Sequence, residues 1–311
     1  MLAKLLRGTD VVLAVTGATG WLGAVALDLL YGAFGDEADA RVVGYASSAC
    51  ELVVSDGRTA AIRPLLELPS ARPAPTTLLH FAFVNRERMA TLGVDAYVSQ
   101  NIAITATVLD AIAAHRPRHV VVASSGAVYG PSGRLASDLR ANPYGTLKHL
   151  DEMAFRAAAQ DVGATCVVPR VFSVAGDRMP QSGIYALASM IAMALAGGPI
   201  QVFAAAPVYR SYCGADEMIA VALWAALFGR EGTFDTCGTV VEMGELASLV
   251  AQAQALPAGS VRRVWDPALT AERYAGDGAA MEKLASEAGM LLRDLPKLVR
   301  DSSASCIAAT R

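Results

Sequence analysis

The 311-residue sequence lacks the features that mark several protein classes. It has five scattered cysteines and no Cys-x-x-Cys pair, so a disulfide framework is excluded and the thiols are expected to be reduced. Its four histidines show no ligand spacing with these cysteines, and no metal site is predicted. Charged residues make up 18% of the chain and the formal net charge is −3, which argues against a general nucleic-acid binder.

Hydrophobic runs long enough for a membrane are also missing. Residues 182–209 carry no charge, but the Gly-Gly-Pro sequence at 197–199 interrupts them and leaves a piece too short to span a bilayer. Near the N-terminus, Lys4 and Arg7 precede the apolar run VVLAV, which is shorter than the core of a signal peptide. We therefore expect a cytoplasmic protein without a membrane partner.

What the sequence does contain is an alternation of strand-like and helix-like segments. Apolar, β-branched runs predict strands at 11–16, 41–46, 77–83, 119–125 and 164–172, and helical patterns lie at 21–32, 94–114 and 143–161. This order predicts an α/β fold with a parallel sheet and right-handed crossovers. The alternation weakens after residue 173, which predicts a first domain at 1–173 and a smaller, mostly helical lobe with short strands at 174–311.

A glycine-rich turn, TGATGWLG, joins the first predicted strand to the first helix. Its first glycine permits a tight turn, the second lets backbone N–H groups approach a pyrophosphate, and the third allows close packing of helix on strand. The segment therefore predicts a Rossmann-type, doubly wound dinucleotide-binding domain, with the C-terminal part as an α/β substrate lobe. The expected cofactor contacts in this turn are Gly17, Thr19, Gly20, Trp21, Leu22 and Gly23.

The end of the second predicted strand bears on the choice of dinucleotide. Ala46, Ser47 and Ser48 stand where an aspartate commonly binds the adenosine ribose. An acid there would repel a 2′-phosphate, whereas small hydroxyls would not, so the segment favours NADP over NAD. The alternative is that Ser47 and Ser48 are only turn residues.

Three further residues suit proton transfer. Tyr144 and Lys148 lie four residues apart at the start of a predicted helix and so share one face. A nearby ammonium lowers the pKa of a tyrosine, which is otherwise near 10 and too high for acid–base work. Ser125 ends an apolar strand, where its hydroxyl can hydrogen-bond a reacting oxygen. Together they suit proton exchange with a carbinol while a nicotinamide carries the hydride.

These segments resemble the extended short-chain dehydrogenases/reductases, the nucleotide-sugar epimerase/dehydratase group, over nearly the whole chain. The matching motifs are TGATGWLG, HFAF at 80–83, the asparagine of QNIAITATVLDA, SSGAVYG at 124–130, NPYGTLK, PRVFSVAGDR at 169–178 and YRSYCGADEM at 209–218. The resemblance implies that Ser125, Tyr144 and Lys148 are catalytic. It adds Ala82, Phe83, Asn101 and Val171 to the cofactor contacts, with Tyr144 and Lys148, and assigns Ser125, Gly126, Ser173, Arg178 and Arg210 to the substrate.

The resemblance also implies a substrate, a nucleotide-diphosphate sugar, whose diphosphate Arg210 would hold. Gly126 and Ala127 stand where the dehydratases of this group carry an acid pair, which disfavours a 4,6-dehydratase. A 4-ketoreductase using NADPH is the favoured reading, because the second-strand acid is absent; the alternative is a 4-epimerase with tightly bound NAD. A non-sugar carbonyl reductase and a non-catalytic dinucleotide-binding protein are remoter readings. The resemblance further implies a homodimer through helices 94–114 and 143–161.

Overall fold

The computed structural model describes residues 2–6, 8–130, 133–181 and 183–309. The chain divides into two compact units, Met1–Val171 with Ile219–Phe234, and Phe172–Met218 with Asp235–Arg311. The division at residue 171 lies two residues from the boundary that the sequence predicts. The return of residues 219–234 to the first unit is a feature that the weakening of the alternation does not predict.

The first unit is built on a largely parallel sheet with the strand order β12-β8-β6-β5-β1-β2-β4-β3, and β7 pairs with β8. The strands are β1 (Leu13–Thr16), β2 (Val42–Ala46), β3 (Cys50–Val53), β4 (Thr59–Pro64), β5 (Thr77–His80), β6 (His119–Val122), β7 (Ser124–Ser125), β8 (Thr165–Val171) and β12 (Gly232–Asp235). β1 pairs in parallel with both β2 and β5, so the winding direction reverses between β1 and β5. This confirms the predicted doubly wound fold and places its ligand crevice at the carboxyl ends of these two strands.

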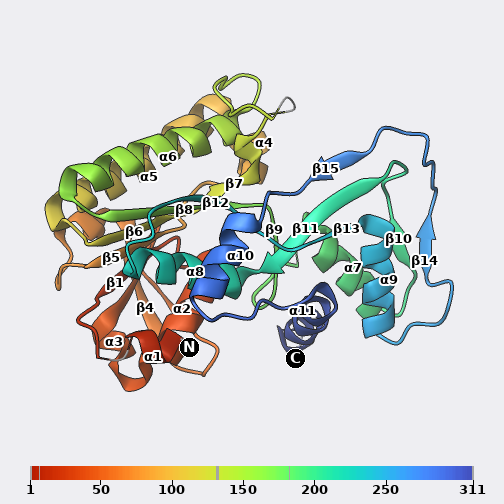
Figure 1. Ribbon diagram of the computed structural model, residues 1–311, viewed down its shortest axis with the longest axis horizontal. Coiled ribbons are helices and arrows are strands. Elements are labelled where there is room, and N and C mark those ends of the chain that lie inside the picture. Colours follow the sequence, from red (N-terminus) through yellow and green to blue (C-terminus); the bar gives the residue numbers. More distant parts are fainter. Residues whose placement is uncertain (1, 7, 131–132, 182, 310–311) are drawn as a thin grey trace. The chain divides into compact units, whose positions relative to one another are not determined.

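Helices cover the first unit's sheet. They are α1 (Leu2–Leu6), α2 (Trp21–Phe34), α3 (Ala38–Arg41), α4 (Met89–Leu92), α5 (Val94–His115) and α6 (Pro143–Val162), with the 3-10 turns η1 (Gly35–Glu37), η2 (Leu65–Ser70), η3 (Arg86–Arg88) and η4 (Gly126–Val128). α5 and α6 lie side by side along one face of the sheet (Figure 1). The three helices that the sequence predicts in this region correspond to α2, α5 and α6.

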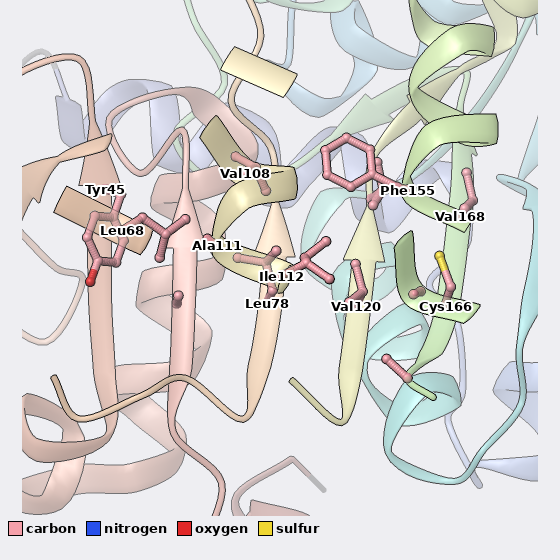
Figure 2. Close-up of a cluster of buried hydrophobic side chains, with 14 of the residues drawn as sticks. Tyr45, Leu68, Leu78, Val108, Ala111, Ile112, Val120, Phe155, Cys166 and Val168 are labelled. Atoms are coloured by element: carbon pink, nitrogen blue, oxygen red, sulfur yellow. The ribbon is translucent and has the colours of Figure 1, made fainter. Parts of the chain in front are cut away.

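One hydrophobic core of this unit lies between the sheet and the helix pair α5–α6. Figure 2 shows Tyr45 of β2, Leu78 of β5 and Val120 of β6 on the side of the sheet that faces Ile112 of α5 and Phe155 of α6, all of them buried. The apolar strand sequences supply both faces of the sheet, as a doubly covered sheet requires. This packing fixes α6, and with it the Tyr144–Lys148 face, against the strand ends.

The second unit contains two smaller sheets. One has the order β13-β11-β15 with β9 beside β11, and the other pairs β10 with β14. Its elements are β9 (Ser173–Ala175), α7 (Ala186–Leu195), β10 (Ile200–Val202), β11 (Val208–Gly214), β13 (Thr239–Glu242), α9 (Met243–Ala253), β14 (Val261–Arg263), β15 (Glu272–Tyr274), α10 (Ala279–Glu287) and α11 (Leu295–Ala309), and α8 (Ala215–Leu227) begins in this unit and ends in the first. Across the described ranges, no helix is both long and apolar enough to cross a lipid bilayer.

Candidate active site

The glycine turn has the crowded geometry that a dinucleotide cradle needs. Gly17 adopts a positive φ of 67°, and a Cβ there would lie 2.6 Å from the backbone nitrogen of Ala82. A Cβ on Gly23 would lie 2.1 Å from the carbonyl oxygen of Gly17. Neither position accepts a side chain, and α2 begins directly after Gly20 without a side-chain cap. The first N–H groups of α2 are thus presented to an anion at the end of β1.

The end of β2 carries the two serines considered above. β2 ends at Ala46, and Ser47 and Ser48 form an exposed bend, while Tyr45 accepts a backbone hydrogen bond from Ala18 in the glycine turn. The bend therefore lies next to the turn, where the ribose of a bound dinucleotide is expected. Contacts of Ser47 and Ser48 with that ribose remain a prediction.

The loop after β5 is held by two buried polar side chains. Thr16 Oγ1 lies 2.7 Å from His80 Nδ1 and accepts a hydrogen bond from the Ala82 nitrogen at 3.3 Å. Asn101 accepts from the Val84 nitrogen at 2.8 Å and donates to the Tyr97 carbonyl at 3.0 Å. Burial, followed by the charge of Lys148, lowers the pKa of His80 to about 3, so this imidazole is neutral. Asn101 acts here on the loop; its predicted contact with a nicotinamide ribose remains a prediction.

The two serines of the serine motif have different surroundings. Ser124 donates a 2.5 Å hydrogen bond to Glu152 Oε1. Ser125 caps η4 by accepting from the Ala127 nitrogen at 3.2 Å, and it pairs with Val171 in the β7–β8 register, while Gly126 is the first residue of η4. Ser124 is thus committed to a buried carboxylate. This supports the choice of Ser125 over Ser124 as the residue that meets a substrate.

The start of α6, the helix that carries Tyr144, packs closely against the loop that follows Ser125. Asn142 accepts from the Gly145 nitrogen at 2.9 Å and donates to the Ala127 carbonyl at 2.9 Å, with Pro143 as the first helical residue. A Cβ on Gly145 would lie 2.1 Å from that same carbonyl oxygen. Sequence reasoning missed Asn142 and Gly145 as site residues, although Asn-Pro before a helix is a recognisable helix start.

Lys148 is buried behind Tyr144 on α6. It is 6% exposed, and its Nζ donates a 2.9 Å hydrogen bond to the Ala123 carbonyl and lies 3.9 Å from the centroid of the Phe83 ring. Burial lowers the pKa of Lys148 to about 8, against the opposing effect of the nearby carboxylates Asp151 and Glu152. The amine therefore titrates close to neutral pH, which is typical of a functional group.

A buried charge network that sequence reasoning missed supports the serine strand. Glu152 is 0% exposed and accepts from Arg170 Nε at 2.9 Å and from Arg170 Nη2 at 2.8 Å. Arg170 Nη1 also donates to the Tyr129 hydroxyl at 2.6 Å. Burial raises the pKa of Glu152, but the hydrogen bonds from Arg170 and Ser124 outweigh it and leave that pKa below its usual value. The sequence feature that could have indicated this network is an acidic residue, Glu152, one helical turn after Lys148 on the buried face of α6.

In the second unit, Arg210 and Ser173 lie on neighbouring strands. Arg210 on β11 is ion-paired with Glu272 of β15 at 2.6 Å and lies over the Tyr274 ring, 5.6 Å from its centroid. Ser173 on β9 pairs in register with Tyr212, two residues beyond Arg210. Arg178 follows β9 with a positive φ of 58° and lies outside this sheet. The structure thus places Ser173 and Arg210 on paired strands of one sheet, and Arg178 three residues beyond the end of β9.

The doubly wound fold and the glycine turn are typical of an enzyme that uses a dinucleotide. The model of the NAD dependent epimerase/dehydratase family matches residues 13–235, and the chain belongs to that family. No curated protein matches the chain in sequence.

Solved structures of similar fold cover almost the whole chain. A UDP-N-acetylglucosamine 4-epimerase from Methanobrevibacter ruminantium M1, in complex with UDP-N-acetylmuramic acid, is 16% identical, with a TM-score of 0.78 over 97% of this chain and 99% of that one. A UDP-glucose-4-epimerase from Stenotrophomonas maltophila, with bound NAD and formylated UDP-arabinopyranose, is 18% identical, with a TM-score of 0.75 over 97% and 99%. A dTDP-glucose 4,6-dehydratase from Streptomyces venezuelae is 20% identical, with a TM-score of 0.70 over 94% and 96%. At these identities the likeness establishes the fold alone.

The residues present fit the cofactor that the family name implies. Gly17 and Gly23 leave no room for side chains, and the N-terminus of α2 faces the end of β1. The bend at Ser47 and Ser48 adds no carboxylate, so its chemistry accepts either dinucleotide. The family's description names NAD as the cofactor. Among the described residues, only this bend favours the predicted NADP.

Proposed function

We propose that the chain is a nucleotide-sugar 4-epimerase that retains NAD. The observation that carries the proposal is the set Ser125, Tyr144 and Lys148 at the carboxyl edge of the sheet, with Gly126 and Ala127 in place of an acid pair. Such a set can move one proton on and off a carbinol but offers no second acid for eliminating water. The epimerases among the structures of similar fold support this reading over the ketoreductase that the sequence favours.

The protein's own part in the reaction is proton handling. A nicotinamide dinucleotide held at the glycine turn would supply reversible hydride transfer at the carbinol carbon, with the hydride returned to the opposite face of the ketone. Tyr144, as phenolate, takes the hydroxyl proton during oxidation and gives it back during reduction. Lys148 stabilises that phenolate by its charge, and Ser125 donates a hydrogen bond to the reacting oxygen. No net change of cofactor results.

Arg210 is the proposed contact for the substrate diphosphate. The side chain of its present partner Glu272 is 65% exposed. Breaking this ion pair therefore leaves no buried, unpaired carboxylate and costs little free energy. A diphosphate offers stronger, bidentate hydrogen bonds than this exposed carboxylate. Arg210→Ala is expected to weaken binding of nucleoside diphosphates, measured by calorimetry, and to leave NAD affinity unchanged.

The reductase remains the second candidate because of the bend at Ser47 and Ser48. The deciding experiment is to measure the nucleotide that copurifies with the protein and then supply UDP-, GDP-, CDP- and dTDP-sugars. An epimerase arrives loaded with NAD and interconverts two sugars without a change in NADH absorbance. A protein that arrives empty and consumes NADPH with a 4-keto sugar would replace the epimerase by the reductase.

We also propose a homodimer through α5 and α6. Ile102 on α5 and Leu150 and Met153 on α6 are 53%, 42% and 48% exposed. Several exposed apolar side chains on two neighbouring helices are typical of a surface that binds a partner. Light scattering is expected to give twice the chain mass, and Ile102→Glu with Met153→Glu to give monomers.

A further inference from the structure

Phe83 touches both members of the tyrosine–lysine pair. It follows β5 in the loop that Asn101 holds, and its ring lies edge-on to the Tyr144 ring, with centroids 5.6 Å apart and an interplanar angle of 79°. The Lys148 Nζ lies 3.9 Å from the centroid of the same ring. On its other side the ring packs edge-on to Tyr97 of α5, at 6.3 Å. One aromatic side chain therefore links positions one helical turn apart on α6.

The ammonium group of Lys148 has few other direct contacts. One N–H is used by the Ala123 carbonyl at 2.9 Å, and within the described part of the chain no carboxylate forms an ion pair with it. The titratable groups around it are Asp151 and Glu152 on its own helix, His80 at the end of β5 and Tyr97 on α5. Glu152 is committed to Arg170, and His80 is neutral. The charge of Asp151 favours the ammonium from one turn away, and the Phe83 ring face is in direct contact with it.

We infer that Phe83 is a positioning residue of the site, whose ring face holds the Lys148 ammonium ion beside Tyr144. A cation over an aromatic face is most strongly stabilised where water is excluded, and Lys148 is buried. Without the ring, the buried ammonium loses its proton more readily, and a neutral amine lacks the positive charge that stabilises a phenolate. The inference rests on the proposed function only in giving Tyr144 the acid–base role.

The test uses the scarcity of lysine. The chain has only four, Lys4, Lys148, Lys283 and Lys297, so lysine labelled with ¹³C at Cε gives four signals, and Lys148→Arg identifies the buried one. Phe83 is replaced by mono-, di- and trifluorophenylalanine, which keep the ring's shape and progressively weaken its negative face. We expect the pKa of Lys148 to fall step by step, by about one unit over the series. A Lys148 pKa that does not change with fluorination overturns the inference.

A pair of ordinary variants gives the same test if the fluorinated chains do not fold. Phe83→Tyr keeps an aromatic face and should keep the Lys148 pKa, whereas Phe83→Leu fills similar space without that face and should lower it. Equal pKa values in the two variants contradict the inference. Because this measurement needs no substrate, it stands even if the epimerase assay fails. Where activity is found, the alkaline limb of kcat/KM should move with the Lys148 pKa.

Discussion

Two neighbouring turns of α6 each bury a charge, and they treat it differently. Lys148 has a backbone carbonyl and an aromatic face as its contacts, and burial lowers its pKa to about 8. Glu152, one turn further, is ion-paired with Arg170 through two hydrogen bonds and accepts a third from Ser124. The first charge is left able to change, and the second is fixed. The same helix therefore carries a group suited to chemistry beside a group that holds the strand of Ser125 in place.

Removing the hydroxyl of Tyr144, which lies one helical turn before Lys148, should have the largest effect on activity. Tyr144→Phe deletes only the proton-transfer group, so we expect turnover to fall by about 100- to 10,000-fold while folding and NAD binding persist. Tyr97→Phe is the matched control, because the Tyr97 hydroxyl is buried without a partner among the described residues. Activity measured in both variants decides; near-normal turnover of Tyr144→Phe would sink the proposed mechanism.

Breaking the fixed pair should cost stability. Arg170→Met leaves Glu152 buried without its partner, and such losses amount to about 3–5 kcal/mol. Arg156→Met is the control, since Arg156 contacts the same carboxylate at 3.5 Å from a side chain that is 42% exposed. Its loss should cost less than about 1 kcal/mol. Urea unfolding of both variants measures the difference, and equal costs would show that Glu152 does not depend on Arg170.

Removing the Lys148 charge should raise the free energy of unfolding, whereas removing Arg170 should lower it. A pKa lowered from 10.5 to about 8 means that the folded state resists the ammonium, at a cost of about 3 kcal/mol below pH 8. Lys148→Met removes that cost and loses the hydrogen bond to Ala123, worth about 1 kcal/mol. We expect a net gain of about 2 kcal/mol at pH 7 together with loss of activity. The sign follows from the lowered pKa: the cost of the charge shrinks as pH rises from 8 and is lost near 10.5, so the net gain disappears before pH 10.5 and the lost hydrogen bond then leaves the variant less stable.

The exposed Lys297→Met serves as the control, because its side chain is 54% exposed and removing it should change little at either pH. Unfolding measured at pH 7 and pH 10 completes the test. A Lys148→Met protein that is less stable than wild type at pH 7 would contradict the account of this charge.

The fold and the placement of the motif residues could be predicted from the sequence better than the side chains that hold those motifs in position. The glycine turn, Tyr144, Lys148 and the sheet could be predicted because strand and helix periods and short motifs are local. Arg170 could not be paired with Glu152 from sequence, because the two lie on different elements and meet only when α6 packs on the sheet. Gly145 looked like an ordinary residue until the Ala127 carbonyl was seen against it. In the second unit, β11 has the adjacent polar residues Arg210 and Ser211 at its centre, so its sequence is recognisable as a motif but lacks the apolar run or the strict alternation that predicts a strand.

The smallest predicted effect concerns Asp151, which lies between the two turns and resembles neither. Burial raises its pKa, while Lys148 and a hydrogen bond with Thr105 oppose that rise. The Thr105 hydroxyl lies 2.7 Å from Asp151 Oδ1 and 3.0 Å from the Asn101 carbonyl, yet it has one proton to donate. When that proton goes to Asn101, a hydrogen bond between Thr105 and Asp151 requires a protonated carboxyl, so in that arrangement the raised pKa of Asp151 and the Thr105 contacts act in the same direction.

In its ionised state Asp151 favours the Lys148 ammonium, and Asp151→Asn should lower the Lys148 pKa by about one unit. The alkaline limb of activity should then shift to lower pH by the same amount. Asp161→Asn makes the same change of charge at an exposed position of α6 and should shift neither quantity. The ¹³C signal of Lys148 measures the pKa directly. An unchanged value in Asp151→Asn would mean that Asp151 stays protonated while Lys148 titrates, and that the Ala123 carbonyl and the Phe83 ring hold the ammonium without it.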